Sequence, residues 1–162
     1  MMDLFDKDAK EVVDNISQKN IPLAEKLRPK VLDEVIGQDK TLASDGQLKS
    51  MVKSGQLSSI IFWGPPGVGK TTLARVIANE VSAHYEEISA IFSGVSDLKK
   101  LLTAATVRHS NGSKTILFVD EIHRFNKSQQ DSFLPYMENG TIVLIGATTE
   151  NPSFELNSAL LS

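Results

Sequence analysis

The chain has 162 residues, 41% of them hydrophobic and 23% charged, with a formal net charge of −3. This composition is ordinary for one globular domain with a core, and it gives no sign of a fibre, a membrane span or wholesale disorder. Because there is no cysteine, disulfides and thiolate metal sites are excluded, and the three histidines lack the spacing of metal ligands, so any metal is expected to arrive with a ligand.

The first 38 residues are expected to form a tail and an ordered linker. Within residues 1–20, apolar side chains at helical spacing predict a short amphipathic helix: Ala9, Val12, Val13 and Ile16. The start, Met1–Phe5, has neither the basic flank nor the apolar segment of a secretion signal, and we expect a cytoplasmic protein. Pro22 and Pro29 prevent one continuous helix over residues 21–38, which are therefore predicted to be a linker.

From residue 39 onward, apolar runs alternate with helical patterns. The apolar runs predict four strands, over residues 59–63, 85–91, 115–121 and 141–145. Helical spacing predicts helices over residues 39–54, directly after residue 70, over 96–109 and 125–139, and a short helical turn within 152–162. Strands that alternate with helices through short loops predict an α/β fold, with a parallel sheet covered by helices on both faces.

Two of these helices have specific expectations. The helix over 96–109 is expected to bury its apolar residues and the valine before it: Val95, Leu98, Leu101, Leu102 and Ala105. In the helix over 125–139, Pro135 is expected to kink or loosen the preceding turn, and Gly140 to end the helix in the left-handed conformation.

A phosphate-loop pattern lies between the first predicted strand and the helix that follows it. Residues 64–71 read Gly-Pro-Pro-Gly-Val-Gly-Lys-Thr and fit G-x-x-x-x-G-K-[ST]. Its three glycines allow turns that a Cβ would forbid, so successive N–H groups can converge on a phosphate at the start of a helix. Lys70 is expected to reach the β- and γ-phosphates, and the Thr71 hydroxyl to bind Mg²⁺. The alternative is a turn followed by a surface lysine, but the whole pattern rarely occurs by chance in a chain of this length.

Two adjacent acids, Asp120 and Glu121, end the strand predicted over residues 115–121. In a parallel sheet, ligands bind beyond the carboxyl ends of the strands, so Asp120 is expected to face the phosphate loop and to bind Mg²⁺ through water. Glu121 can polarise a water for in-line attack on the γ-phosphate. Either Thr148 or Thr149, after the next strand, is expected to hydrogen-bond that water or the γ-phosphate. The alternatives are a solvated turn for the acids and a helix cap for the threonines.

Two groups of basic residues raise the question of nucleic-acid binding, which the overall charge does not indicate. The groups are Lys26, Arg28 and Lys30, and His123, Arg124 and Lys127. DNA contact is one interpretation, and a solvated surface is the more common one.

The order of these motifs resembles that of the AAA+ ATPases. The phosphate loop, Val119–Ile122 and Gly146–Thr149 are similar to their Walker A, Walker B and sensor 1 motifs, and residues 22–38 resemble the adenine-wrapping linker of the clamp-loader and RuvB-like clade. Two longer stretches, Asp120–Asp131 and Gly146–Phe154, resemble specifically the replication-associated recombination protein A family, which includes the eukaryotic Werner-helicase-interacting ATPases.

The resemblance covers about residues 21–162 and implies an AAA+ three-layer sandwich with a parallel sheet. It divides the chain into a tail over 1–20, a linker over 21–38 and a nucleotide-binding core over 39–162. It implies an ATPase that uses ATP and Mg²⁺ at stalled replication forks or single-strand gaps in DNA. The implied partners are further copies in a tetramer and a single-stranded-DNA-binding protein, and the implied location is the cytoplasm, at the nucleoid.

The resemblance also assigns roles to individual residues. Contacts to the nucleotide are expected from Ile36, Gly37, Gly64, Pro65, Pro66, Gly67, Val68, Gly69, Lys70, Thr71, Thr72 and Asp120. Lys70, Glu121 and Thr149 are expected to be catalytic, and Thr71 and Asp120 to bind Mg²⁺. Ser89 stands where related ATPases often have an asparagine that restrains the Walker B glutamate, so the sequence departs from the family there, as it does in Ser44–Gly46 and residues 1–20.

Two other functions are weighed against an active ATPase. One is a nucleotide-binding but inactive clamp-loader-like assembly subunit, against which the intact Lys70, Asp120 and Glu121 speak. The other is a small-molecule kinase, for which the sequence shows neither an acceptor pocket nor an arginine-rich lid. In addition, Met1–Phe5 resembles the sliding-clamp-binding pentapeptide at its last three positions, the alternative being a tail that docks on its own domain.

The AAA+ resemblance implies further parts beyond Ser162: an arginine that reaches the neighbouring subunit, a fifth strand and a helical lid. We therefore expect a piece of a longer protein, truncated before the fifth strand. By itself it is expected to bind nucleotide weakly, to hydrolyse ATP near background and to form no ordered tetramer. The missing strand would lie beside the first strand and leave Ile60–Phe62 as an apolar edge.

Overall fold

The computed structural model describes residues 28–29, 32, 46–67 and 69–161. Several expectations therefore lie outside the described residues: the helix within 1–20, the clamp-peptide resemblance of Met1–Phe5, most of the linker over 21–38 with Ile36 and Gly37, residues 39–45, and Val68. None of the helices within the described ranges is long and apolar enough to cross a membrane.

A four-stranded parallel sheet in the order β1-β4-β3-β2 forms the centre of the molecule. Its strands are β1 (Ile60–Trp63), β2 (His84–Ser89), β3 (Thr115–Asp120) and β4 (Ile142–Thr148). The central strands β3 and β4 are almost entirely buried, which explains their unbroken apolar sequences. The predicted parallel α/β sheet is confirmed, and β1 lies at one edge of the described sheet.

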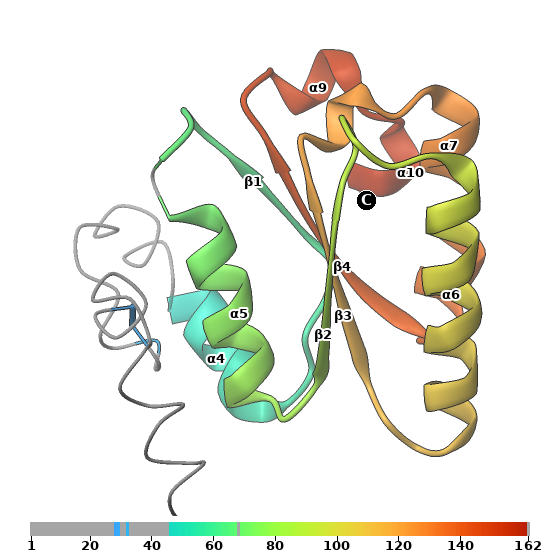
Figure 1. Ribbon diagram of the computed structural model, residues 1–162. Coiled ribbons are helices and arrows are strands. Elements are labelled where there is room, and N and C mark those ends of the chain that lie inside the picture. The colour runs from blue at the N-terminus through green and yellow to red at the C-terminus, as the bar shows by residue number, and fades with distance from the viewer. Residues whose placement is uncertain (1–27, 30–31, 33–45, 68, 162) are drawn as a thin grey trace, which may run out of the picture.

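Helices cover both faces of this sheet, giving three layers (Figure 1). Helices α4 (Gly46–Ser54) and α5 (Lys70–Glu80) lie on one side, where Leu73, Ile77 and Phe118 belong to one apolar cluster. On the other side lie α6 (Val95–Ser110), α8 (Leu134–Glu138) and α10 (Ser158–Leu161), where Leu98 and Leu144 belong to the second cluster. Burial of these two clusters supplies most of the driving force for folding.

The turn from β2 to α6 differs from the prediction. The strand predicted over residues 85–91 ends at Ser89, because the Ser89 carbonyl accepts hydrogen bonds from the N–H groups of Phe92 and Ser93 and closes a turn. Ile91, Phe92 and Val95 are then exposed by 55%, 89% and 63%. Burial of Val95 was therefore a wrong prediction, whereas Leu98, Leu102 and Ala105 are buried as expected and Leu101 is partly buried.

The helix predicted over residues 125–139 is in fact two shorter helices, α7 (Lys127–Asp131) and α8. The 3-10 turn η2 (Ile122–Arg124) comes before them. A reciprocal cap starts α7, because the Asn126 side chain accepts from the Gln129 N–H at 2.8 Å and the Gln129 side chain accepts from the Asn126 N–H at 2.9 Å. Pro135 lies in the first turn of α8, where its missing N–H costs no helical hydrogen bond. Proline therefore begins a new helix here instead of kinking a long one, and Gly140 ends it at φ +77°.

A buried glutamine joins the segment after β3 to the segment after β4. The Gln130 side chain, 1% exposed, donates to the carbonyls of Phe125 at 3.0 Å and Glu155 at 3.1 Å, and accepts from the Asn157 N–H at 2.8 Å. Glu155 ends the short helix α9 (Pro152–Glu155). Because buried polar groups need partners, these three hydrogen bonds fix the two segments that leave the carboxyl ends of β3 and β4.

Gly146 in β4 permits close packing between β1 and the η2 turn. It lies opposite Ile61 of β1, and a Cβ added to it would approach Ile61 Cδ1 to 2.7 Å and Ile122 Cδ1 to 3.1 Å. Ile122 is completely buried and directly follows Glu121. A glycine at this position therefore sets how closely η2 can lie against the sheet.

Gly146→Ala is expected to lower the free energy of unfolding by about 1–3 kcal/mol, because the added methyl group overpacks this contact. Ile61→Val removes the Cδ1 atom that the methyl group meets, at its own cost of about 0.5–1.5 kcal/mol. The double variant should therefore be more stable than the sum of the single effects, as measured by urea denaturation. Additive losses would show that Ile61 is not the obstructing group.

Candidate functional site

The loop between β1 and α5 has the backbone that a phosphate loop needs. Gly67 and Gly69 adopt φ values of +81° and +88°, in the left-handed region that favours glycine. Gly64 contributes hydrogen bonds instead: its N–H donates to the Thr148 carbonyl at 3.1 Å, and its own carbonyl accepts from Lys70 Nζ at 2.7 Å. The loop is thus fastened to the end of β4.

Helix α5 begins at Lys70 with free N–H groups at its start. Its N-cap residue is Gly69, which offers no side-chain acceptor, and its first turn has no acidic residue. The first N–H groups of an α-helix have no acceptor within the helix, and together with the helix dipole they favour an anion. Directly after β1, the sequence therefore places a loop and a helix N-terminus of the kind that binds phosphate.

A pocket of about 330 Å³ joins this loop to the acid pair. It is lined by Pro66, Gly67, residues 69–72, Asp120 and Glu121. Strands β1 and β3 are separated by β4, yet all three end at the same edge of the parallel sheet. The phosphate loop and the two acids therefore line one pocket in the structure, as the parallel sheet predicts.

Lys70 is half-buried and held in the pocket by backbone oxygens. Its ammonium donates to the Gly64 carbonyl at 2.7 Å and to the Thr148 carbonyl at 3.3 Å. An ammonium group has three donors, so one remains for a ligand.

The two acids line the same pocket because the backbone changes conformation between them. Successive side chains of a regular strand point to opposite faces. Glu121 leaves the strand in the left-handed region, at φ 51° and ψ 46°, which is unfavourable for a residue other than glycine. Its N–H donates to Asp120 Oδ1 at 3.1 Å. This strained residue turns the second carboxylate back toward the pocket, in keeping with the different angle expected for it.

Residues that leave β3 and β4 hold the Glu121 carboxylate. Thr149 Oγ1 donates to Glu121 Oε2 at 3.1 Å, and His123 Nε2 lies 3.3 Å from the same oxygen. Thr148, with no exposed surface, points inward, and its hydroxyl lies 2.8 Å from His123 Nδ1. The two threonines are thus distinguished: Thr149 reaches the carboxylate at the pocket and Thr148 lies beneath it.

His123 was assigned to the wrong environment by sequence. It was grouped with Arg124 and Lys127 as a basic surface, but its side chain is 6% exposed and contacts Glu121. Arg124 and Lys127 are exposed, while Lys26 and Lys30 lie outside the described residues. The sequence signal for burial of His123 is its apolar neighbours in sequence, Ile122 and Phe125, which are both buried.

Ser89 lies opposite Asp120 in the pairing of β2 with β3. Within the described chain, the side chains that contact the Glu121 carboxylate come from Thr149 and His123. Thr149 and His123 therefore contact Glu121 in a chain whose Ser89 departs from the asparagine that the AAA+ resemblance leads us to expect.

The site fits a magnesium ion that arrives with phosphate. Among the described residues no group of three or more histidine, aspartate or glutamate side chains could hold a metal by itself. Thr71 and Asp120, however, line the same pocket. Mg²⁺ commonly takes one or two protein ligands and completes its octahedron with water and substrate phosphates, so these two residues suffice.

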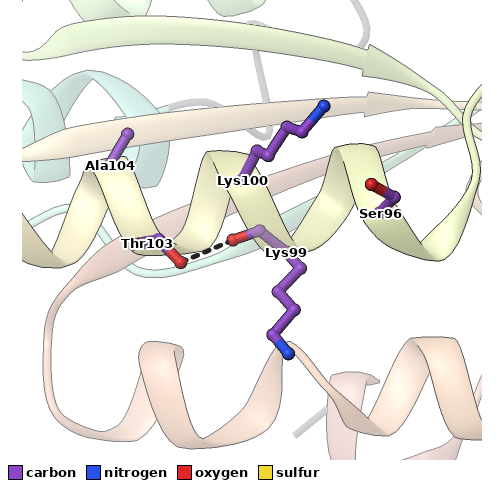
Figure 2. A pocket seen from close by; sticks show the side chains of 5 residues that line it. All are labelled: Ser96, Lys99, Lys100, Thr103 and Ala104. Atoms are coloured by element: carbon purple, nitrogen blue, oxygen red, sulfur yellow. Dashed lines mark hydrogen bonds between the residues drawn. The ribbon is translucent and has the colours of Figure 1, made fainter.

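A second hollow, of about 490 Å³, lies on the outer face of α6 (Figure 2). Its lining residues all come from that helix: Ser96, Lys99, Lys100, Thr103 and Ala104. The Thr103 hydroxyl donates to the Lys99 carbonyl at 2.8 Å, and the two lysine side chains extend in different directions. Although larger than the pocket at the phosphate loop, this open surface has no convergent polar groups of the kind that fix a small ligand.

A family model described as the Holliday junction DNA helicase RuvB P-loop domain matches residues 27–160. The chain belongs to this family of P-loop domains. Among solved structures, the RuvB Holliday junction branch migration motor of Thermotoga maritima superposes with a TM-score of 0.66 at 34% identity, over 83% of this chain and 45% of that one. The predicted AAA+ fold is therefore confirmed.

Curated relatives of this P-loop domain confirm the resemblance to the replication-associated recombination protein A family. The protein of that name from Escherichia coli K12 is 57% identical over 141 residues, which is 87% of this chain and 32% of the relative. The ATPase WRNIP1 of Dictyostelium discoideum is 50% identical over 149 residues, 91% of this chain and 17% of the relative. The chain thus spans about a third or less of the length of these relatives.

Proposed function

We propose that the chain is the ATP-binding and ATP-hydrolysing core of an AAA+ ATPase that serves DNA replication and recombination. Membership of a P-loop family supports nucleotide binding and ATPase activity in general. The observation that carries the proposal is the pocket in which the phosphate loop meets Asp120 and Glu121. Since the chain spans only part of its relatives, the activity of a whole protein is part of the proposal.

In this proposal the phosphate loop and α5 bind the triphosphate. Backbone N–H groups between Gly67 and Thr72 surround the phosphates, and the remaining donor of Lys70 reaches the β- and γ-phosphates. The Thr71 hydroxyl would hold Mg²⁺ directly and Asp120 would hold it through water, and the bound ion would supply positive charge beside the β- and γ-phosphates. Ile36, Gly37 and Val68, which lie outside the described residues, complete the proposed contacts to the nucleotide.

Glu121 is the proposed general base. Its carboxylate takes the proton of a water that attacks the γ-phosphorus in line, and the products are ADP and inorganic phosphate. Thr149 is the proposed sensor 1 residue, because its hydroxyl already lies at the glutamate and can turn to the water or the γ-phosphate. The contact supports this assignment to Thr149 over the buried Thr148.

The proposed partner is DNA, at stalled forks or single-strand gaps, and the support is what related proteins are named for. The matching family is named for a Holliday junction helicase, and the Escherichia coli relative for replication-associated recombination. A tetramer, a single-stranded-DNA-binding protein and a sliding clamp that binds Met1–Phe5 are further proposed partners, with the nucleoid as the location. The rival proposal is an inactive clamp-loader-like subunit with the same pocket.

Lys70→Ala is expected to weaken ATP binding at least tenfold, because it removes a charge-assisted contact worth more than about 1.4 kcal/mol. Titration calorimetry measures this directly. Trp63 is 60% exposed and directly precedes the loop, so its fluorescence offers a second readout. Lys99→Ala, on the exposed face of α6, is the matched control and should bind ATP like the unmodified chain. Equal affinity of the Lys70 variant would refute the phosphate role.

Glu121→Gln is expected to leave ATP affinity unchanged and to lower turnover about 100-fold or more, because general bases contribute about 10²–10⁴-fold. The amide can still accept the hydrogen bond from Thr149, so the geometry is preserved. Turnover is measured in the full-length protein by release of inorganic phosphate. If the rival proposal is correct, the full-length protein binds ATP without turnover and the substitution changes nothing.

A further inference from the structure

We propose that His123 is a positioning residue that holds the Glu121 carboxylate for catalysis through a chain of polar contacts anchored on Thr148. The inference rests on the proposed function, since it concerns the carboxylate that activates water. This chain of contacts joins two segments that are separate in sequence: residues 121–123, which leave β3 and enter the η2 turn, and residues 148–150 at the end of β4.

The distances link these groups in one order. The Glu150 N–H donates to Thr148 Oγ1 at 3.1 Å, Thr148 Oγ1 lies 2.8 Å from His123 Nδ1, and His123 Nε2 lies 3.3 Å from Glu121 Oε2. The chain of contacts thus begins at the Glu150 backbone amide and ends at the Glu121 carboxylate.

The direction of the hydrogens follows from the carboxylate. An ionised carboxylate only accepts, so the contact at Nε2 is favourable only if that nitrogen carries a hydrogen. In a neutral ring Nδ1 is then an acceptor, and the hydroxyl of Thr148 must donate to it. The same hydroxyl has another acceptor, the Glu150 carbonyl at 3.3 Å, but donation there would put the ring hydrogen on Nδ1 and leave a lone pair facing Glu121. The geometry therefore assigns the Nε2–H tautomer.

Burial keeps the imidazole ring in place. The His123 side chain is 6% exposed and Thr148 is not exposed at all. Ile122 and Phe125, on either side of the ring in sequence, are 0% and 2% exposed. Glu121 itself has a strained backbone that persists only where its surroundings hold it. His123 is thus a rigid support for a residue that needs one.

Thr149 and His123 have different tasks on the same oxygen. The Thr149 hydroxyl has a single hydrogen, which here goes to Glu121 Oε2. When that hydrogen turns to the water or the γ-phosphate, His123 Nε2 is the remaining polar contact of Oε2 among the described side chains. The other oxygen, Oε1, has no hydrogen-bond partner among the described side chains and is available to the water. Thr149 can therefore respond to the nucleotide while His123 keeps the carboxylate aligned.

Two amide substitutions separate this role from simple filling of buried space. In His123→Gln the amide nitrogen can take the place of Nε2 and donate to Glu121. In His123→Asn it can take the place of Nδ1, where it meets Thr148 but does not reach Glu121. We expect His123→Asn to lower kcat of the full-length protein about 10- to 100-fold, as misplacement of a catalytic group does, with ATP affinity changed less than about twofold. His123→Gln should be markedly faster than His123→Asn.

Thr148→Val removes the anchoring hydroxyl with little change in shape. It should lower kcat in the same direction, and combining it with His123→Asn should add little, because both break one chain. Circular dichroism and the calorimetric ATP affinity show whether each variant is folded. Equal kcat of the two amide variants, additive losses in the double variant, or a loss of ATP affinity without a fall in kcat would each overturn the proposal.

The tautomer can be read without turnover. A nitrogen-15 correlation spectrum of the imidazoles in the nucleotide-free protein, at about pH 8 where a free histidine is neutral, should show hydrogen on Nε2 and none on Nδ1 of His123. A hydrogen on Nδ1 would refute the assigned chain. Failure of the proposed function would give a different result, namely unchanged turnover of Glu121→Gln. The tautomer measurement does not depend on that result.

Discussion

The two halves of the site both depend on one residue at the end of the central strand β4. The backbone carbonyl of Thr148 accepts from the Gly64 N–H at 3.1 Å and from Lys70 Nζ at 3.3 Å, and so holds the phosphate-binding half. Its side-chain hydroxyl, 2.8 Å from His123, holds the half that carries Glu121. Thr148 has no exposed surface, so it can act on a ligand only through these neighbours.

The strand order explains why such a residue can exist. Because β4 lies between β1 and β3, its last residue is next to both the phosphate loop and the acid pair. Gly146, two residues earlier, lets the η2 turn lie close against the sheet, and Gln130 ties the segments after β3 and β4 together. Residues that do not line the pocket thus set the distance between the groups that do.

The fold and the main site could be predicted because their signals are local or follow from parallel topology. The phosphate loop is a contiguous pattern, and the carboxyl ends of parallel strands must meet, which was enough to bring Asp120 and Glu121 to the loop. Val95 and His123 were misjudged because burial depends on which neighbours cover a residue. Val95 is 63% exposed, and the buried Ile122 and Phe125 flank a histidine that charge alone would place in solvent. The helix over 125–139 was misjudged for a local reason, because Asn126 caps α7 and Pro135 lies in the first turn of a separate helix, α8.

The hydrogen bonds of Lys70 have a consequence for the entropy of binding. A free lysine side chain has about 2 kcal/mol of rotamer entropy to lose when it is ordered. In this structure Gly64 and Thr148 already hold the ammonium, so much of that ordering takes place during folding. A phosphate that enters the pocket meets a cation in a fixed place, and the affinity it gains from the charge is correspondingly less offset by loss of side-chain freedom.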